Sequence, residues 1–394
     1  MKRMNKAFIL LMMAVLCLSF YTGCQTGIPM GDETKAPFVN PYDAAENACL
    51  AHRFVDGICS QCDVPYVPSE GLSFSLSEDG TGYLVNGIGE CKDTQIMIPA
   101  TYEQLPVLGL MPRALQGAKE VTYVHLPEGA TGIGEWALQD CVNLRRIEIP
   151  PTVNHIGREA FSGCLRLSEI VIPEGVLIIS NATFRDCVNL TTMHLPSTLS
   201  VIDQNAFENC RSMTEISIPE SVLQINAQAF KNCDGLTAVR YDGTIDGWCS
   251  IEFDYDDANP VEIAKHLYIG EQLVEGVLTI PEGVVTINRQ ALMGIADITA
   301  VILPESIQTT GSFAGCEQLE YIVFKGSPIN TGDTRVFANT SLAHVYLSDT
   351  KDEARPYIAY LASACKENNV EFHYSDEWAY DDSGVPQLKP TNNP

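Results

Sequence analysis

Apolar residues recur with a period of 23 residues through the middle of the chain. Three kinds of position keep this period in phase: a proline, a large apolar residue and a cysteine. The prolines are Pro127, Pro150, Pro173, Pro196 and Pro219. The large apolar residues are Leu138, Phe161, Phe184, Phe207 and Phe230, and the cysteines are Cys141, Cys164, Cys187, Cys210 and Cys233. A fixed period of this length indicates a solenoid in which each repeat forms one turn.

One repeat predicts a short strand, a stop and a compact turn. Ile147 and Ile149 alternate with polar residues, as in a half-buried strand. Pro150 has no N–H group and therefore ends the strand pairing. Residues 158–161 predict a short helical turn that buries Phe161. One such unit cannot bury its own apolar face, so we expect the units to stack into one elongated core with a parallel sheet along one side.

The limits of the period suggest a division of the chain. We expect about nine turns between Cys91 and Asp349. Flanking segments predict caps that shield the ends of the core, as a solenoid requires. We expect an N-terminal hairpin cap and first repeat over 72–118, followed by the repeat array over 119–349 with an inserted segment at 241–275. A C-terminal cap over 350–375 should contain a helix at 353–366 and a strand at 370–374. Residues 376–394 should form a disordered tail.

The repeat resembles the BspA-type leucine-rich repeat family of bacterial surface proteins. The elements I-P-E/S, A-F and C-x-x-L recur in phase, and the resemblance covers residues 72–349. It implies a right-handed α/β repeat solenoid with a parallel β-sheet on its concave face and short helical turns opposite. It also implies that the inserted segment precedes a strand and a hairpin, and that the concave face is used for binding.

The N-terminus is typical of an export signal. Lys2, Arg3 and Lys6 precede an uncharged run over 7–20, which is too short to span a bilayer. The following Tyr21-Thr22-Gly23-Cys24 resembles a bacterial lipobox, which implies cleavage after residue 23 and lipidation of Cys24. Ordinary cleavage nearby is the alternative. Residues 24–48 then predict a flexible tether, and we expect the lipid to be the only membrane attachment.

The net charge of the chain limits the classes of partner that it can bind. The chain has 24 Lys+Arg and 50 Asp+Glu, and its formal charge is −26. Removal of residues 1–23, with three basic and no acidic residues, would take this charge from −26 to −29. So large an acidic excess opposes phosphate backbones and excludes nucleic-acid binding.

A cluster of cysteine and histidine over 49–71 is the candidate metal site. Cys49-x-x-His52 and Cys59-x-x-Cys62 resemble a small zinc knuckle with four ligands and no open position. A structural zinc is therefore one hypothesis. Disulfides are the second, because cysteines outside the cytoplasm often pair, with Cys91 as a possible fourth thiol. An unpaired, metal-free segment is the third. The repeat cysteines instead occupy equivalent inward positions with parallel side chains, so we expect buried free thiols there.

The outward positions of the predicted strands are the candidate ligand-binding residues. Aromatic, arginine and carboxylate side chains on a rigid sheet can form a recognition surface. The leading candidates are Tyr123, His125, Arg146, Glu148, Glu169, Thr192, His194 and Glu215. The same strand positions in other turns hold Val171, Ser217, Ala238, Arg240, Tyr321, Val323, His344 and Tyr346.

The sequence contains none of the common catalytic or phosphate-binding motifs. We therefore expect a monomeric, lipid-anchored surface protein that binds a protein or glycan ligand outside the cell without catalysis. An envelope scaffold that binds another protein of the same cell is the alternative. A third hypothesis is an enzyme or its accessory, which a zinc site with an open coordination position would favour.

Overall fold

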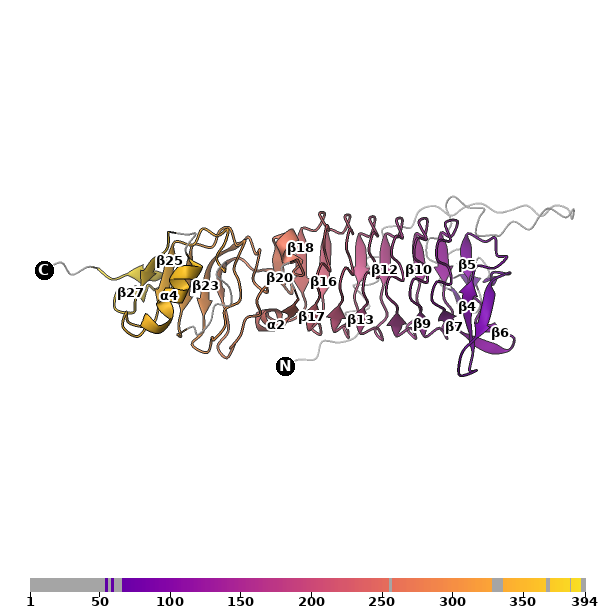
Figure 1. The fold of residues 1–394 in the computed structure, drawn as a ribbon, viewed down its shortest axis with the longest axis horizontal. Helices are drawn as coiled ribbons and strands as arrows, with labels where there is room; N and C mark the ends of the chain where they lie inside the picture. Colours follow the sequence, from indigo (N-terminus) through magenta and orange to yellow (C-terminus); the bar gives the residue numbers. More distant parts are fainter. Residues whose placement is uncertain are drawn as a thin grey trace, which may run out of the picture. The chain divides into compact units, whose positions relative to one another are not determined.

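The computed structural model describes residues 54–55, 58–59, 66–254, 257–327, 336–365, 369–382 and 384–390. Parallel strands stack turn upon turn into a β-solenoid (Figure 1). The described part of the chain makes about 12 turns. The expected number, about nine between Cys91 and Asp349, is slightly lower. β20 (Leu267–Ile269) adds a strand where the 23-residue spacing is lost, and β26 (Glu371–His373) lies beyond Asp349.

One side of the solenoid carries the strands that the alternating pattern predicts. Partners in consecutive turns are 23 residues apart: Arg146 pairs with Tyr123, Thr192 with Glu169, and Ala238 with Glu215. Each central residue, such as Ile147, points into the core. The strands are β5 (Gln95–Met97), β8 (Tyr123–His125), β10 (Arg146–Glu148), β12 (Glu169–Val171), β14 (Thr192–His194), β16 (Glu215–Ile218), β18 (Ala238–Tyr241) and β20.

A second row of shorter strands forms another side. Its members follow the buried prolines, whose carbonyls accept an N–H from the residue three positions later, as in Pro150 and Val153. The row comprises β7 (Leu105–Leu110), β9 (Gly132–Ile133), β11 (His155–Ile156), β13 (Ile178–Ile179), β15 (Val201–Ile202), β17 (Gln224–Ile225) and β19 (Glu252–Phe253).

The third side consists of turns that hydrogen-bond from one repeat to the next. Leu138 N–H donates to the Ala160 carbonyl, and Phe161 N–H donates to the Thr183 carbonyl. The predicted helix over 158–161 does not form. Glu159 has φ 53°, and the equivalent Asn205 has φ 56°; a left-handed residue in each turn interrupts a right-handed helix.

The core is built from ladders of identical side chains. The rings of Phe161, Phe184, Phe207 and Phe230 are fully buried and stack with centroid distances of 5.3, 5.7 and 5.2 Å. Such spacing is within the range of favourable aromatic pairs. The repeat cysteines are also fully buried, as the inward position predicts. Each donates its S–H to a carbonyl of the preceding turn, for example Cys187 Sγ to Phe161 O at 3.2 Å.

A hairpin lies at the N-terminal end, where the sequence predicts one. β3 (Ser73–Leu76) and β4 (Tyr83–Gly87) pair antiparallel. β4 then pairs in parallel with β7, which continues the second row, and β6 (Thr101–Tyr102) folds back on β7. Before this cap, the backbones of β1 (Phe54–Val55) and β2 (Ile58–Cys59) form a small antiparallel pair.

The inserted segment adds a strand to each of the two rows, and its hairpin then ends the first row. It contains α2 (Ile245–Ser250), β19, α3 (Val261–Ala264) and the predicted hairpin of β20 and β21 (Gln272–Leu273). Trp248 of α2 is fully buried and donates its Nε1–H to the Ala291 carbonyl at 2.6 Å. Because β21 occupies the far edge of β20, a new parallel sheet starts at β22 (Gly276–Thr279).

The new sheet carries the C-terminal half of the array. It continues through β23 (Ile298–Leu303), β24 (Tyr321–Phe324), β25 (His344–Leu347) and β26. Helix α4 (Arg355–Ala364) lies within the predicted helix and precedes β26. The sequence predicts disorder from residue 376, but β27 (Trp378–Tyr380) and β28 (Pro386–Leu388) form an antiparallel hairpin instead. Among the described residues, none of the helices has the length and apolarity that a bilayer crossing requires.

Candidate functional site

The outward residues of β8, β10, β12, β14, β16 and β18 form one surface, which we call the sheet face. Its middle is open to solvent, and Val171 there is 64 % exposed. The exposed positions are Glu169, Val171, Thr192, His194, Glu215 and Ser217. His125, Arg146, Glu148, Ala238 and Arg240 are half-buried. The structure therefore brings most of the predicted ligand-binding residues onto one accessible surface.

The N-terminal end of the sheet face is covered. Tyr66 packs its ring edge-on against His125, 5.5 Å between centroids, and its hydroxyl donates to the Ile98 carbonyl. Ser69 N–H donates to the Met97 carbonyl at 2.8 Å, which holds this segment in place. Tyr123 lies beneath Tyr66 and is only 6 % exposed. The expectation of an exposed Tyr123 side chain is therefore wrong, because a segment outside the repeats buries it.

Two outward residues of the C-terminal half are covered as well. Val323 and Tyr346 were expected at the surface by analogy with the other strands, but both are buried. Trp378 of β27 packs against Tyr346, 5.2 Å between centroids, and donates its Nε1–H to the Leu347 carbonyl at 3.0 Å. The open part of the face therefore lies between β10 and β18.

A groove of about 460 Å³ lies at the entry to β10 and β12. Its walls carry Arg145, Arg146 and Arg166, together with Ser168, Glu169 and Asn189. Arg146 Nη1 lies 2.6 Å from Glu169 Oε1. Arg145 and Arg166 are exposed and form no ion pair within the described part of the chain. Two guanidinium groups without a carboxylate partner make this groove suited to an anionic group, which arginine can bind through two parallel hydrogen bonds.

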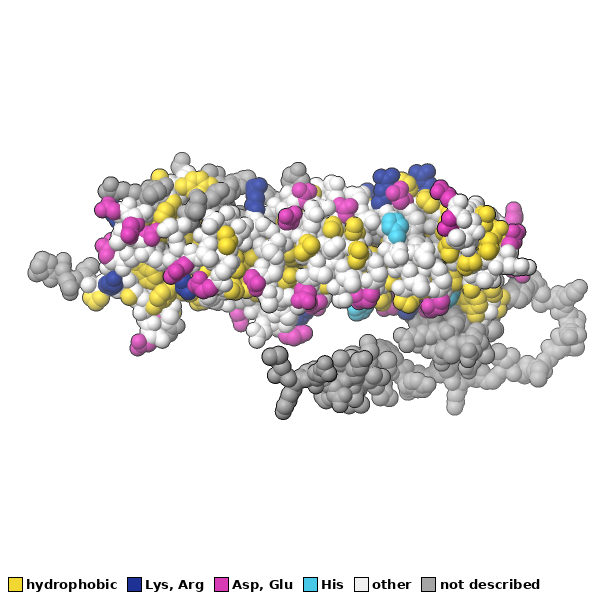
Figure 2. Space-filling view, turned by 90° about the horizontal axis from the view of Figure 1, so that it is seen from below, with side chains coloured by type: hydrophobic (Ala, Val, Ile, Leu, Met, Phe, Trp, Pro, Cys, Tyr) yellow, Lys and Arg dark blue, Asp and Glu magenta, His cyan; other side chains and the backbone are white. Residues whose placement is uncertain are grey.

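Other charges on the sheet face have partners. Arg240 Nε lies 2.8 Å from Glu215 Oε1, and its guanidinium stacks 4.4 Å above the Tyr268 ring. His125 Nδ1 lies 3.0 Å from Glu148 Oε2. In the space-filling view, acidic side chains are scattered along the visible surface, and basic ones gather in a few places (Figure 2). The arginine groove is thus a local exception on an acidic protein.

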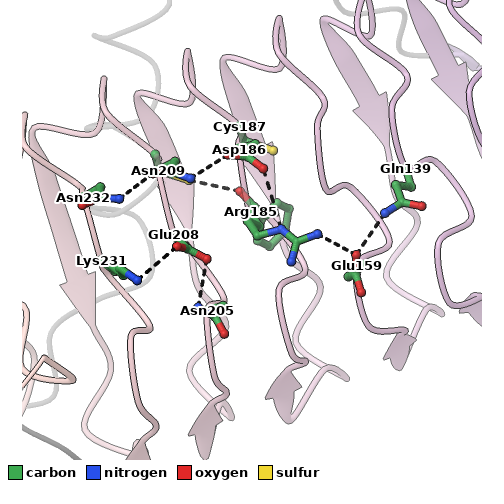
Figure 3. Close-up of polar contacts among 12 residues, drawn as sticks. Gln139, Glu159, Arg185, Asp186, Cys187, Asn205, Glu208, Asn209, Lys231 and Asn232 are labelled. Carbon is green, nitrogen blue, oxygen red and sulfur yellow. Dashed lines mark hydrogen bonds and ion pairs between the residues drawn. The ribbon is translucent and has the colours of Figure 1, made fainter.

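The turn side carries a ladder of polar contacts (Figure 3). Arg185 Nη2 donates to Glu159 Oε2 at 2.9 Å, and Gln139 donates to the same carboxylate oxygen at 3.0 Å. Asn209 Nδ2 donates to Asp186 Oδ1 at 2.7 Å, and its Oδ1 accepts from Asn232 at 2.8 Å. Because these groups satisfy one another across turns, the ladder serves the stacking of repeats rather than ligand binding.

The core thiols are placed for packing and not for reaction. Burial raises the pKa of Cys141, Cys233 and Cys316 to about 12. A thiolate is the reactive form of cysteine, so these side chains are poor nucleophiles and poor metal ligands near neutral pH.

The family model of the BspA type leucine rich repeat region matches the chain over residues 111–237 and 253–362, with six copies. The match spans more than half of the chain. The chain belongs to the BspA-type leucine-rich repeat family. Members of this family are typically cell-surface proteins, and leucine-rich repeat proteins are typically non-catalytic binding scaffolds. A search of curated proteins finds no match.

Solved structures of bacterial leucine-rich repeat proteins are similar to this family member in fold. A leucine rich cell surface protein from Faecalibacterium prausnitzii is 22% identical, with 78% of this chain and 94% of that chain covered and a TM-score of 0.39. A leucine-rich repeat protein from Bacteroides ovatus is 18% identical, with 77% and 98% covered and a TM-score of 0.36. The T. pallidum leucine rich repeat protein is 21% identical, with 64% and 90% covered and a TM-score of 0.34.

Several predicted residues of this BspA-type protein lie outside the described part of the chain. These are the lipidation candidate Cys24 and the zinc candidates Cys49, His52 and Cys62. Of Cys59 only the backbone is described, as the last residue of β2. The zinc, disulfide and unpaired alternatives for this segment stay predictions.

Sequence reasoning missed two residues of the groove. Arg145 and Arg166 precede their strands and fall outside the alternating pattern that identifies outward positions. A signal was available in the repeat: Arg166 lies two residues after Cys164, and Arg145 lies four residues after Cys141. Both positions come before the strand of their turn, and both line the same groove.

Proposed function

We propose that the protein is a non-enzymatic, surface-exposed binding protein that recognises an acidic group on a protein or glycan ligand. The arginine groove is the observation that carries this proposal: Arg145 and Arg166 present unpaired guanidinium groups beside the open sheet face. Family membership supports a binding role, since such scaffolds are typically non-catalytic.

The surroundings of the groove extend the contact area. Val171, exposed on β12, offers an apolar surface, and Thr192 and His194 follow on β14 with polar groups. A carboxylate or sulfate of the ligand would bind the two arginines, while its neighbouring atoms would lie along the strands. The groove is shallow and open, so affinity would come from many contacts of this kind around a charged anchor.

The test is a binding screen of the purified chain against host matrix proteins and a glycan array that includes sulfated and uronic-acid glycans. We expect a saturable ligand whose affinity falls about tenfold or more in the double variant Arg145→Ala, Arg166→Ala, given the strength of charge-assisted hydrogen bonds. Affinity should also fall with added salt.

Arg211→Ala is the matched control, because Arg211 is an exposed arginine away from the groove. It removes one positive charge, half of the change in the double variant, and should leave affinity nearly unchanged. Equal losses of affinity in both variants would show that binding depends on net charge and not on this groove. A blank screen with correctly folded protein would instead favour the envelope-scaffold role, with a partner in the same cell.

Attachment through a lipid on Cys24 completes the proposal. The Cys24→Ala variant should move from the membrane fraction to the soluble fraction of the producing cells. Retention of that variant in the membrane fraction would show that another segment or partner holds the protein.

A further inference from the structure

Two histidines and a carboxylate meet on the C-terminal strands. His344 Nδ1 lies 3.1 Å from His373 Nε2 and 3.8 Å from Glu371 Oε2. One ligand atom from each of the three residues lies within 4.8 Å of the other two. This is the one such group of three or more metal-ligating side chains in the part of the chain that the structure describes.

Strand pairing produces this arrangement. β25 and β26 run parallel with His344 opposite Glu371. Glu371 and His373 are two residues apart on β26, so both side chains leave the same face of the strand. His373 is 6 % exposed and stacks on Tyr346, 4.7 Å between centroids, which restricts its ring. The three groups are therefore held by the backbone register and by packing rather than by a flexible loop.

The spacing fits a small divalent cation. Tetrahedral Zn²⁺ with bonds of about 2.0–2.1 Å places its ligand atoms roughly 3.3 Å apart. The two separations from His344 Nδ1, 3.1 and 3.8 Å, lie on either side of that value, and the third is at most 4.8 Å. Two imidazoles and one carboxylate are a common donor set for zinc and other late transition metals.

We propose that His344, Glu371 and His373 bind a divalent transition-metal ion, with Zn²⁺ as the best fit. The His344 and Glu371 side chains are 41% and 67% exposed, so the ion reaches the site from solvent. Three protein ligands leave a coordination position for water or for a donor atom of another molecule. The donors are nitrogen and oxygen, which distinguishes this site from the predicted cysteine-rich knuckle.

The experiment is calorimetric titration of the full chain with Zn²⁺. The predicted knuckle must not contribute, so all variants carry Cys49→Ser, Cys59→Ser and Cys62→Ser. We expect one bound equivalent, lost in His344→Ala and weakened at least tenfold in Glu371→Gln. His155→Ala is the matched control, because His155 is an exposed histidine on a strand outside the sheet face, and it should keep the full affinity.

Co²⁺ gives a second readout. Its visible bands should appear without the strong thiolate charge-transfer absorption that a cysteine site produces, and His344→Ala should abolish them. Zn²⁺ should raise the melting temperature of the parent but not that of His344→Ala, whose half-exposed side chain can be removed without a buried cavity. No saturable binding, or equal binding by the parent and His344→Ala, would overturn the proposal and leave a simple histidine–histidine hydrogen bond.

Discussion

The ring of Phe184 stacks on that of Phe207 with 5.7 Å between centroids and 3° between planes. The two residues hold the same position in consecutive repeats. Each ring therefore fills the space between its neighbours, and removing one leaves a cavity inside a column.

Replacement of Phe184 by alanine should destabilise the array by about 3–5 kcal/mol, as for other buried aromatic residues. Phe184→Leu should be much milder, because Leu138 fills the equivalent position of an earlier turn. Urea unfolding followed by circular dichroism measures both. Similar losses in the two variants would show that ring stacking, and not volume, stabilises the column.

Asn209 allows a test of how the turn side of the solenoid contributes to stability. Its φ of 64° lies in the left-handed region, and its side chain bonds to Asp186 and Asn232. Asn209→Gly keeps the favourable backbone and loses only the side-chain contacts. Asn209→Ala also incurs the strain of a left-handed Cβ, about 1–2 kcal/mol. The alanine variant should therefore be the less stable by that amount in urea unfolding, and equal stabilities would mean that the turn relaxes.

The core thiols predict a loss of stability in alkali. Burial raises the pKa of Cys141 and Cys233 from 9.0 to about 12 in the folded state. A raised pKa means that folding favours the protonated thiol. This contribution is complete below pH 9 and is lost as the pH rises towards 12, by at most about 1.4 kcal/mol per pH unit for each thiol.

The Cys141→Ala, Cys233→Ala double variant isolates this effect from other groups that titrate in alkali. Its free energy of unfolding should decline less steeply than that of the parent between pH 9 and pH 12. Parallel declines would contradict the prediction, because they would show that these thiols ionise as readily in the folded chain as in the unfolded one.

The C-terminal hairpin depends on Trp378, which is 7% exposed and covers Tyr346 and Val323. Trp378→Ala should release β27 and β28, with faster hydrogen exchange over 376–390 and little change in β10–β18. Leu388→Ala, at a 57% exposed position of β28, should exchange like the parent. Unchanged exchange in Trp378→Ala would show that the pairing of β27 with β28, and not Trp378, stabilises the hairpin.

Repetition explains which parts of the fold the sequence predicts. Phe184 and Cys187 are recognisable as core residues because each recurs with the same spacing and the same surroundings. Outward positions such as Glu169 and Thr192 follow from strand alternation alone. The helix predicted over 158–161 does not form because one residue in each turn is left-handed. The sequence does not reveal this residue, since different side chains occupy the position, among them Glu159.

The repeat pattern does not predict which other segments of the chain cover the repeats. Tyr66 and Trp378 come from segments without a period, and their contacts bury Tyr123 and Tyr346. The pairing of His344 with Glu371 spans 27 residues and a helix, so the 23-residue spacing gives no register for it. Single, non-repeated contacts therefore decide which repeat positions stay accessible.

The parallel stacking of β10 through β18, with β12 paired in register to β14 and β16 to β18, also gives the protein a fixed length scale. Equivalent side chains in adjacent paired strands stand one strand spacing apart, ~4.8 Å. Each turn contacts chiefly its neighbours, so duplication of one 23-residue unit would lengthen the exposed surface by one such step and leave both ends unchanged. The reach of this surface is thus set in single increments by repeat number, independently of the residues that it displays.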